Sequence, residues 1–113
     1  MQLQYSELND SIRLIKLSGA LDIYGVGDVE REFVRLCTGE NVCVLVDLSK
    51  VNYISSIGIP LLINSAKSLA RQGGKMALLH PQKAVENVLE LTGIPLIVPI
   101  YQNLNTAVSE LKK

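Results

Sequence analysis

The feature that most constrains the fold is an uninterrupted apolar run near the middle of the chain, Val42 to Val46, with the sequence VCVLV. The run is short and rich in β-branched residues, as expected of a strand that is buried on both faces. A strand without a polar face needs helices packed on both sides of its sheet. The run is therefore predicted to be the central strand of a layered α/β domain.

Hydrophobic spacing predicts the elements on either side of this strand. The N-terminal segment alternates up to a turn signal at Asn9-Asp10-Ser11 and alternates again from Ile12 to Leu17, which indicates a hairpin. Helices and strands then alternate over the approximate ranges 24–36, 42–46, 55–72, 75–79, 81–91, a strand around Ile97 and Val98, and 103–111. This order predicts one domain over residues 1–113, with a mixed four- to five-stranded sheet and about four helices.

Composition excludes several kinds of partner. Eleven acidic and eleven basic residues balance, and the one basic cluster is Lys112-Lys113, so the sequence lacks the basic stripe that nucleic acids require. No apolar run approaches the ~20 residues that span a bilayer, and the first ten residues lack the pattern of a secretion signal. Cys37 and Cys43 are spaced neither as a redox pair nor as zinc ligands, which favours buried thiols. We expect a cytoplasmic protein with no nucleic-acid or membrane partner.

Two motifs carry functional information. In the first, residues 47–62 (DLSKVNYISSIGIPLL), a buried strand delivers the hydroxyls of Ser55 and Ser56 to the start of a helix. The second is Gly19-Ala20-Leu21-Asp22, after the second predicted strand. Together they resemble the signature of STAS domains of the anti-sigma-factor antagonist branch, in which Asp-Leu-Ser leads through an aromatic residue to a Ser-x-Gly segment. The resemblance implies a STAS fold over essentially the whole chain.

The resemblance also implies a function. In that family the serine two positions before the glycine is phosphorylated by the anti-sigma factor, and here that serine is Ser56, with Ser55 as the alternative. The unphosphorylated protein would bind the anti-sigma factor serine kinase and release a sigma factor, and a PP2C-type phosphatase would be a further partner. The contact surface is expected to include Asp22, Tyr24, Ser55, Ser56, Ile57, Gly58 and Ile59.

General physical chemistry is compatible with a switch at such a serine. A helix N-terminus presents unpaired backbone N–H groups and a partial positive charge, so phosphate on Ser56 would be accommodated without unfolding. The same phosphate adds about −1.5 to −2 charges and disfavours an interface that had packed on a neutral hydroxyl. Ile57 and Ile59 would offer apolar contact, and Gly58 would let a partner's backbone approach closely.

Alternative interpretations of these residues stay open. Ser55 and Ser56 could be only the cap of the following helix, and Asp22 only a turn residue. A STAS subunit could also dock constitutively on a transporter ATPase, with the same helix unmodified. A small hydrolase would need Ser56 and His80, the one histidine, within hydrogen-bonding reach.

The remaining polar and aromatic residues receive structural roles. Tyr24, Tyr53 and Tyr101 are interpreted as half-buried packing residues rather than as a stacking platform, although Tyr24 also belongs to the expected contact surface. Asp47 is interpreted as a local hydrogen-bond acceptor, because no histidine or second carboxylate lies near it in the sequence. No metal site, cofactor or catalytic residue is predicted.

Overall fold

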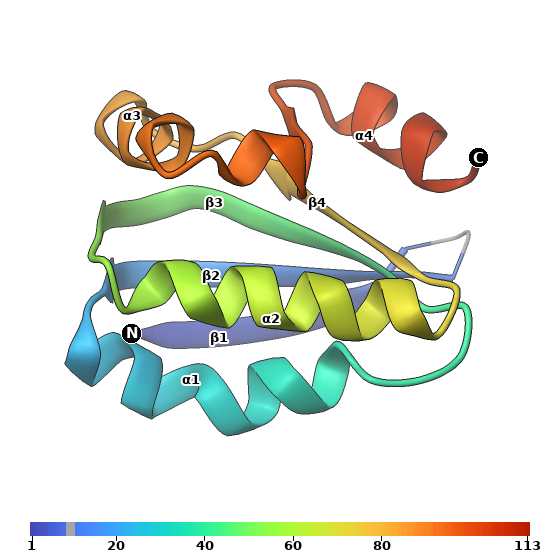
Figure 1. The fold of residues 1–113 in the computed structure, drawn as a ribbon, viewed down its shortest axis with the longest axis horizontal. Helices are drawn as coiled ribbons and strands as arrows, with labels where there is room; N and C mark the ends of the chain where they lie inside the picture. The colour runs from blue at the N-terminus through green and yellow to red at the C-terminus, as the bar shows by residue number, and fades with distance from the viewer. Residues whose placement is uncertain (9–10) are drawn as a thin grey trace.

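The computed structural model describes residues 1–8 and 11–113, and its framework is a five-stranded mixed sheet. The strands lie in chain order: β1 is antiparallel to β2, and the other neighbours are parallel (Figure 1). They are β1 (Gln2–Glu7), β2 (Ile12–Leu21), β3 (Cys43–Ile54), β4 (Lys75–Leu79) and β5 (Ile100–Tyr101). The predicted fold class and the hairpin are confirmed; Asn9 and Asp10 of the predicted turn lie outside the described residues.

The apolar run forms the middle of the sheet, as predicted. Val44, Leu45 and Val46 are fully buried in β3, which lies between β2 and β4. The predicted end of this strand was wrong, because β3 continues through Asp47-Leu48-Ser49 to Ile54. The long β2 keeps pairing with β3 up to Ile54, whereas β4 stops opposite Asp47. Residues 48–54, here called the β3 extension, therefore project beyond β4.

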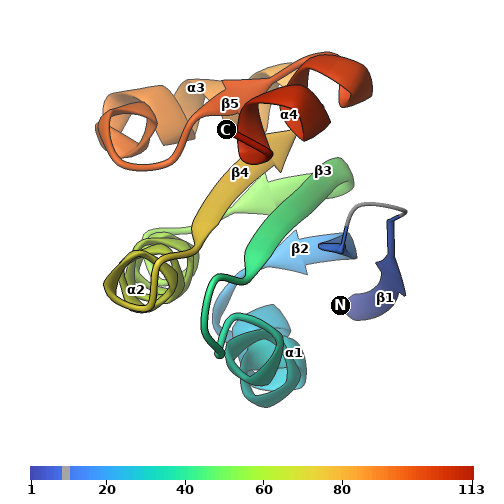
Figure 2. The same ribbon diagram turned by 90° about the vertical axis from the view of Figure 1, so that its right-hand side faces the viewer.

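Four helices complete the layers. α1 (Ile23–Leu36) and α2 (Gly58–Arg71) lie side by side on one face of the sheet, and α4 (Leu104–Leu111) packs on the opposite face (Figure 2). α3 (Lys83–Leu91) follows β4 and contacts β3. The larger apolar core joins the sheet to α1, α2 and α3, and the smaller core lies beneath α4. Among the described residues, none of the helices has the length and hydrophobicity to cross a membrane.

The C-terminal third departs from the prediction in its boundaries. α3 begins at Lys83 rather than at Pro81. Ile97 and Val98 do not form a strand; a short 3-10 helix covers Ile94–Leu96, and β5 starts later. Val98 is fully buried in the larger core, so its apolar character reflected burial and not an extended backbone. α4 begins as predicted, where the Asn103 side chain accepts a hydrogen bond from a backbone N–H.

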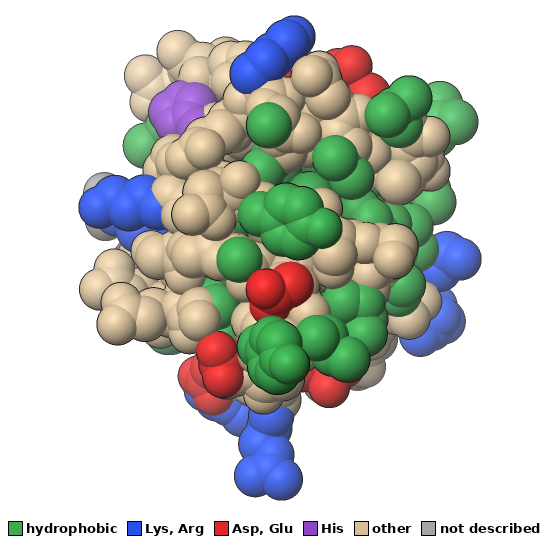
Figure 3. All heavy atoms as spheres, turned by 90° about the vertical axis from the view of Figure 1, so that its left-hand side faces the viewer, with side chains coloured by type: hydrophobic (Ala, Val, Ile, Leu, Met, Phe, Trp, Pro, Cys, Tyr) green, Lys and Arg blue, Asp and Glu red, His purple; other side chains and the backbone are tan. Residues whose placement is uncertain are grey.

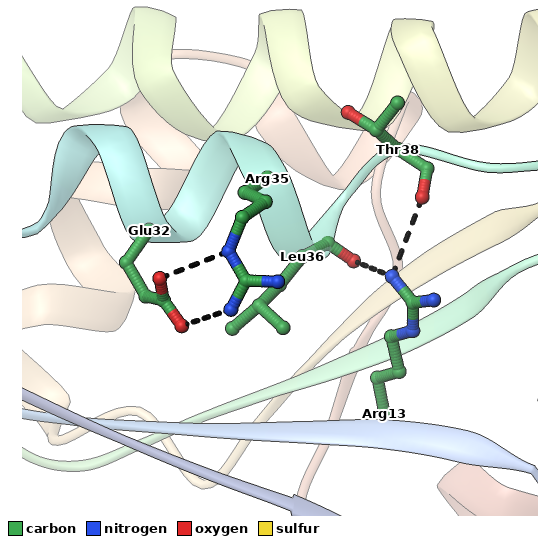
Figure 4. Close-up of polar contacts among 5 residues, drawn as sticks. All are labelled: Arg13, Glu32, Arg35, Leu36 and Thr38. Atoms are coloured by element: carbon green, nitrogen blue, oxygen red, sulfur yellow. Dashed lines mark hydrogen bonds and ion pairs between the residues drawn. The ribbon is translucent and has the colours of Figure 1, made fainter.

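An arginine of β2 fastens the end of α1 to the sheet (Figure 4). Nη1 of Arg13 donates to the backbone carbonyls of Leu36, at 2.8 Å, and Thr38, at 3.3 Å. Carbonyls at a helix C-terminus lack donors within the helix, and they carry the negative end of its dipole. The guanidinium of Arg13 therefore satisfies both needs. Arg35, in the last turn of α1, instead forms an exposed ion pair with Glu32.

Candidate functional site

The segments that leave β2 and β3 meet at one edge of the sheet. Leu21 and Ile54, the last residues of the two strands, are paired in the parallel ladder. Just beyond them, the backbone N–H of Ser55 donates to the carbonyl of Leu21 at 3.1 Å, and the Ser55 hydroxyl donates to the same carbonyl at 3.3 Å. The two motifs found in the sequence are thus joined by direct contacts.

Asp22 closes this junction from the β2 side. Its Oδ1 accepts a hydrogen bond of 2.8 Å from the backbone N–H of Gly25, and Asp22 is the N-cap of α1. The side chain satisfies one of the N–H groups that a helix start leaves unpaired. Tyr24, two residues further, is 81% exposed, so the half-buried packing role expected for it was wrong.

Neither serine caps α2, so the capping interpretation was wrong. The N-cap position is Ile57, and no side chain among the described residues makes a capping hydrogen bond there. Ser55 is partly buried and its hydroxyl is engaged with Leu21, whereas Ser56 is exposed in the turn before the helix. The hydroxyl of Ser56 is therefore the more accessible of the two.

Gly58 and Ile59 serve the interior rather than the surface. A Cβ added to Gly58 would lie 2.9 Å from both Cγ and the carbonyl oxygen of Leu21, so glycine is required for α2 to start against the end of β2. Ile59 is only 7% exposed and belongs to the larger core. The expected roles of Gly58 in admitting a partner's backbone and of Ile59 in apolar contact are therefore corrected. Ile57, at 42% exposed, is left as the apolar neighbour of Ser56.

Exposed apolar side chains stand in the segments next to Ser56. They are Ile23 and Tyr24, just after β2, and Tyr53 and Ile57, on either side of the two serines, and we call these four residues the serine patch. Figure 3 shows the end of the molecule on which apolar side chains gather with acidic side chains among them. Sequence reasoning included the segment from Asp22 to Tyr24 without singling out Ile23, and it assigned Tyr53 to packing. The signal for Tyr53 was its place next to Ile54 in β3, because adjacent strand residues point to opposite faces.

The serine patch continues into a groove of about 470 Å³ between α1 and α2. Ile23 and Ile57 line its mouth together with Pro60, and Val34 and Glu30 line it further along α1. The groove is mostly apolar and open to solvent, which is typical of a surface that receives part of another molecule.

The structure separates Ser56 from His80. Nε2 of His80 lies 2.5 Å from the carbonyl oxygen of Gln102, and His80 follows Leu79, which is level with Asp47. From there the β3 extension adds about 23 Å of strand, at roughly 3.3 Å per residue, before the turn that carries Ser56. This geometry does not favour a serine–histidine hydrolase.

Asp47 and the cysteines complete the set of singled-out residues. Oδ1 of Asp47 accepts from the Ser49 N–H at 2.9 Å, as predicted. Cys37 is buried and Cys43 only partly so, which corrects the expectation for Cys43. The described residues contain no cluster of three or more histidine, cysteine, aspartate or glutamate side chains that could hold a metal ion.

Comparison with known proteins identifies the family. The model of the STAS domain matches residues 6–107. The chain belongs to the STAS domain family. This STAS domain is 39% identical over 75 residues to a candidate anti-sigma factor antagonist of Thermotoga maritima, and the match covers 66% of each chain. It is 27% identical over 108 residues to the anti-sigma F factor antagonist of Paenibacillus polymyxa, covering 94% of this STAS domain and 92% of that relative.

A solved structure shows the same fold in a modified protein. It is the Bacillus cell fate determinant SpoIIAA in its phosphorylated form, which aligns with a TM-score of 0.69 at 17% identity. The alignment covers 96% of this STAS domain and 98% of SpoIIAA. The resemblance expected from the sequence motifs, and the STAS fold that it implied, are confirmed.

Proposed function

We propose that this STAS domain is an anti-sigma-factor antagonist that is switched off by phosphorylation of Ser56. In the unphosphorylated state the serine patch binds an anti-sigma factor that is also a serine kinase, and this binding releases a sigma factor. The names of the relatives support the first part, since two of them are described as anti-sigma factor antagonists.

One observation carries the proposal: an exposed serine stands before a helix without a side-chain cap, in segments that also expose four large apolar side chains. Ser56 is exposed, and the four residues of the serine patch are each at least 42% exposed. Tyrosines, here Tyr24 and Tyr53, are among the residues that contribute most of the binding energy at protein interfaces. A kinase that binds the patch would have the Ser56 hydroxyl within its contact area.

The start of α2 explains how the switch would work without unfolding. No side chain caps this helix among the described residues, so the positive end of its dipole is available to favour a phosphate on the preceding turn. The Gly58 N–H already donates to the Ser55 carbonyl and Pro60 has no N–H, so the dipole is the main source of this stabilisation. The phosphate would nevertheless place about −1.5 to −2 charges within the apolar contact area. Burying that charge against an apolar partner surface is unfavourable, so the complex dissociates.

Ser56 is preferred over Ser55 as the modified residue for a geometric reason. The Ser55 hydroxyl donates to the Leu21 carbonyl and is partly buried, so transfer of phosphate to it would first break this contact. A PP2C-type phosphatase would restore the binding state by removing the phosphate from Ser56, which its exposure permits.

The proposal is tested by capture of the anti-sigma factor from the native cell extract, with and without ATP. We expect the protein to capture a kinase without ATP and to lose it after ATP is added, with phosphate on Ser56 by mass spectrometry. Ser56→Ala should keep binding in the presence of ATP, and Ser56→Asp should bind poorly while keeping the melting temperature of the parent. Undiminished binding by Ser56→Asp would contradict the proposed switch.

The same experiment separates the alternatives. If the protein captures a membrane transporter equally well with and without ATP, it is the constitutive docking subunit considered above. Phosphate found on Ser55 would overturn the assignment of the residue, and phosphate on neither serine would overturn the proposed function.

A further inference from the structure

The two edges of the sheet differ in how they are protected. An exposed strand edge offers unpaired backbone groups to other chains, and proteins protect such edges by shortness, proline, lysine or bulges. β5 is a two-residue strand, which is one of these devices. β1, at the other edge, is six residues long and pairs with β2 without a register shift. Its sequence, QLQYSE, contains no proline and no lysine.

The outer edge of β1 is open among the described residues. β1 is the outermost strand, and in Figure 2 no other labelled element lies beyond it. Five of its six residues are exposed, and Leu3 is partly buried against the larger core. The edge is neutral apart from Glu7 at its end.

Alternation in the ladder identifies which groups are free. The N–H of Leu8 donates to the carbonyl of Ile12, so the backbone groups of Leu8 point toward β2. In an antiparallel pair, successive residues direct their N–H and C=O groups to opposite sides. Within β1, the backbone groups of Leu3, Tyr5 and Glu7 therefore point outward.

We propose that β1 pairs with β1 of a second copy, making a two-fold symmetric dimer with one continuous sheet. Tyr5 lies at the centre and exchanges both of its backbone hydrogen bonds with Tyr5 of the second copy. Leu3 then lies opposite Glu7 of that copy, and each such pair exchanges hydrogen bonds in the same way. The outward groups are thus satisfied in a single register.

Side chains and charge favour this occupant over a different protein. Tyr5 is 44% exposed, and two tyrosines directly opposite in a ladder form a favourable aromatic pair. The two Glu7 carboxylates lie at opposite ends of the pairing, about 14 Å apart at ~3.4 Å per residue. That separation exceeds the Debye length of about 8 Å at physiological salt, so they repel little. The outward backbone groups of β1 are complementary to those of a second β1, and little charge opposes the pairing, so a second copy of the chain is the favoured partner.

The dimer is tested by sedimentation over a concentration series, with hydrogen exchange measured by NMR on the same samples. We expect a concentration-dependent dimer and slower exchange of the amide protons of Leu3, Tyr5 and Glu7 as it forms. The amides of Gln4 and Ser6 already point toward β2, so their exchange should not depend on concentration. A monomer of 12.4 kDa at every concentration would overturn the proposal. Concentration-dependent protection of Gln4 and Ser6, with none of Leu3, Tyr5 and Glu7, would overturn it as well.

Two variants and a control test the register. Tyr5→Lys places two ammonium groups opposite each other and should weaken the dimer at least several-fold. Tyr5→Pro removes an outward N–H without removing a bond to β2, so the fold should persist while the dimer weakens. Leu91→Lys changes an 88% exposed residue of α3 and should leave dimerisation unchanged. Equal dimerisation by Tyr5→Lys and the parent protein would overturn the Tyr5-centred register.

Discussion

The hydroxyl of Ser55 donates a hydrogen bond to the backbone carbonyl of Leu21, 3.3 Å away. The Ser55 N–H donates to the same oxygen at 3.1 Å, so one carbonyl at the end of β2 fixes the position of the residue that follows β3. The Ser55 side chain is thereby held partly buried, whereas the next residue, Ser56, is exposed to solvent. The two adjacent serines consequently differ in what their substitution should do.

Ser55→Ala should lower stability without abolishing the proposed switch. The variant loses the hydroxyl contact with Leu21 but keeps the backbone one, so we expect a loss of about 0.5–1.5 kcal/mol in the free energy of unfolding. Urea denaturation measures this loss. Phosphorylation of Ser56 by the cognate kinase should persist, and its disappearance would show that Ser55 has a direct role in modification.

Gly58→Ala and Gly27→Ala form a matched pair of helix glycines. The added Cβ at position 58 would crowd the backbone oxygen of Leu21, which cannot move without disturbing the sheet, so we expect a cost of about 1–3 kcal/mol. The Cβ added at Gly27, inside α1, meets nothing within 4 Å. Gly27→Ala should instead stabilise by about 0.5–1 kcal/mol. Thermal denaturation of both variants checks the difference, and equal effects would contradict it.

Tyr24→Ala tests the serine patch as a binding surface. An 81% exposed tyrosine makes little contact within its own chain, so the melting temperature should hardly change. If Tyr24 is an anchor of the interface, the Kd for the anti-sigma factor should rise by roughly thirtyfold, or about 2 kcal/mol. Leu91→Ala, an equally exposed apolar residue on α3, is the control and should bind normally.

Cys37 should make the protein sensitive to alkali. Burial raises the pKa of this thiol from its ordinary value of 9.0 to about 12, although nearby Arg13 acts in the opposite direction. Between these values the unfolded chain has lost the proton and the folded protein keeps it. The free energy of unfolding must therefore fall as pH rises from about 9 toward about 12.

Denaturation by urea across this pH range measures the slope. Cys37→Ala removes the titrating group and should reduce the slope, even if the variant is less stable at neutral pH. An identical slope in the variant would show that another group is responsible.

Arg13→Met should destabilise the protein by about 1.5–3 kcal/mol. The variant keeps an unbranched apolar side chain but leaves the carbonyls of Leu36 and Thr38 without their charged donor. Arg35→Met, on the solvent side of α1, removes only an exposed pair with Glu32 and should change stability much less. Comparable losses in the two variants would contradict the role assigned to Arg13.

The sequence predicted what depends on local apolar pattern. Val42–Val46 could be placed at the centre of the sheet because a strand without polar residues must be covered on both faces, and in a layered fold only an inner strand is. The start of α4 was predictable because Asn103 is a strong N-cap residue. Both signals are contained within a few neighbouring residues.

Features that depend on a distant partner were missed. Asp47-Leu48-Ser49 looked like the end of a strand, but β2 is long enough to carry β3 on to Ile54. Ser55 looked like a cap, but its hydroxyl is taken by Leu21, 34 positions earlier in the chain. The glycine at position 58 resembled a surface residue for the same reason, because the group that requires it lies on β2.

Because β3 is longer than β4, the two ends of β3 should differ in how easily they open. The first residues of β3 are clamped between two strands, whereas the β3 extension has strand pairing on its β2 side alone. Fewer cross-strand bonds must break to loosen such an overhang, so its amides should open at lower free energy than those at Val44 and Val46. A docking partner or a kinase could thus reshape the turn that bears Ser56 while the rest of the domain stays rigid.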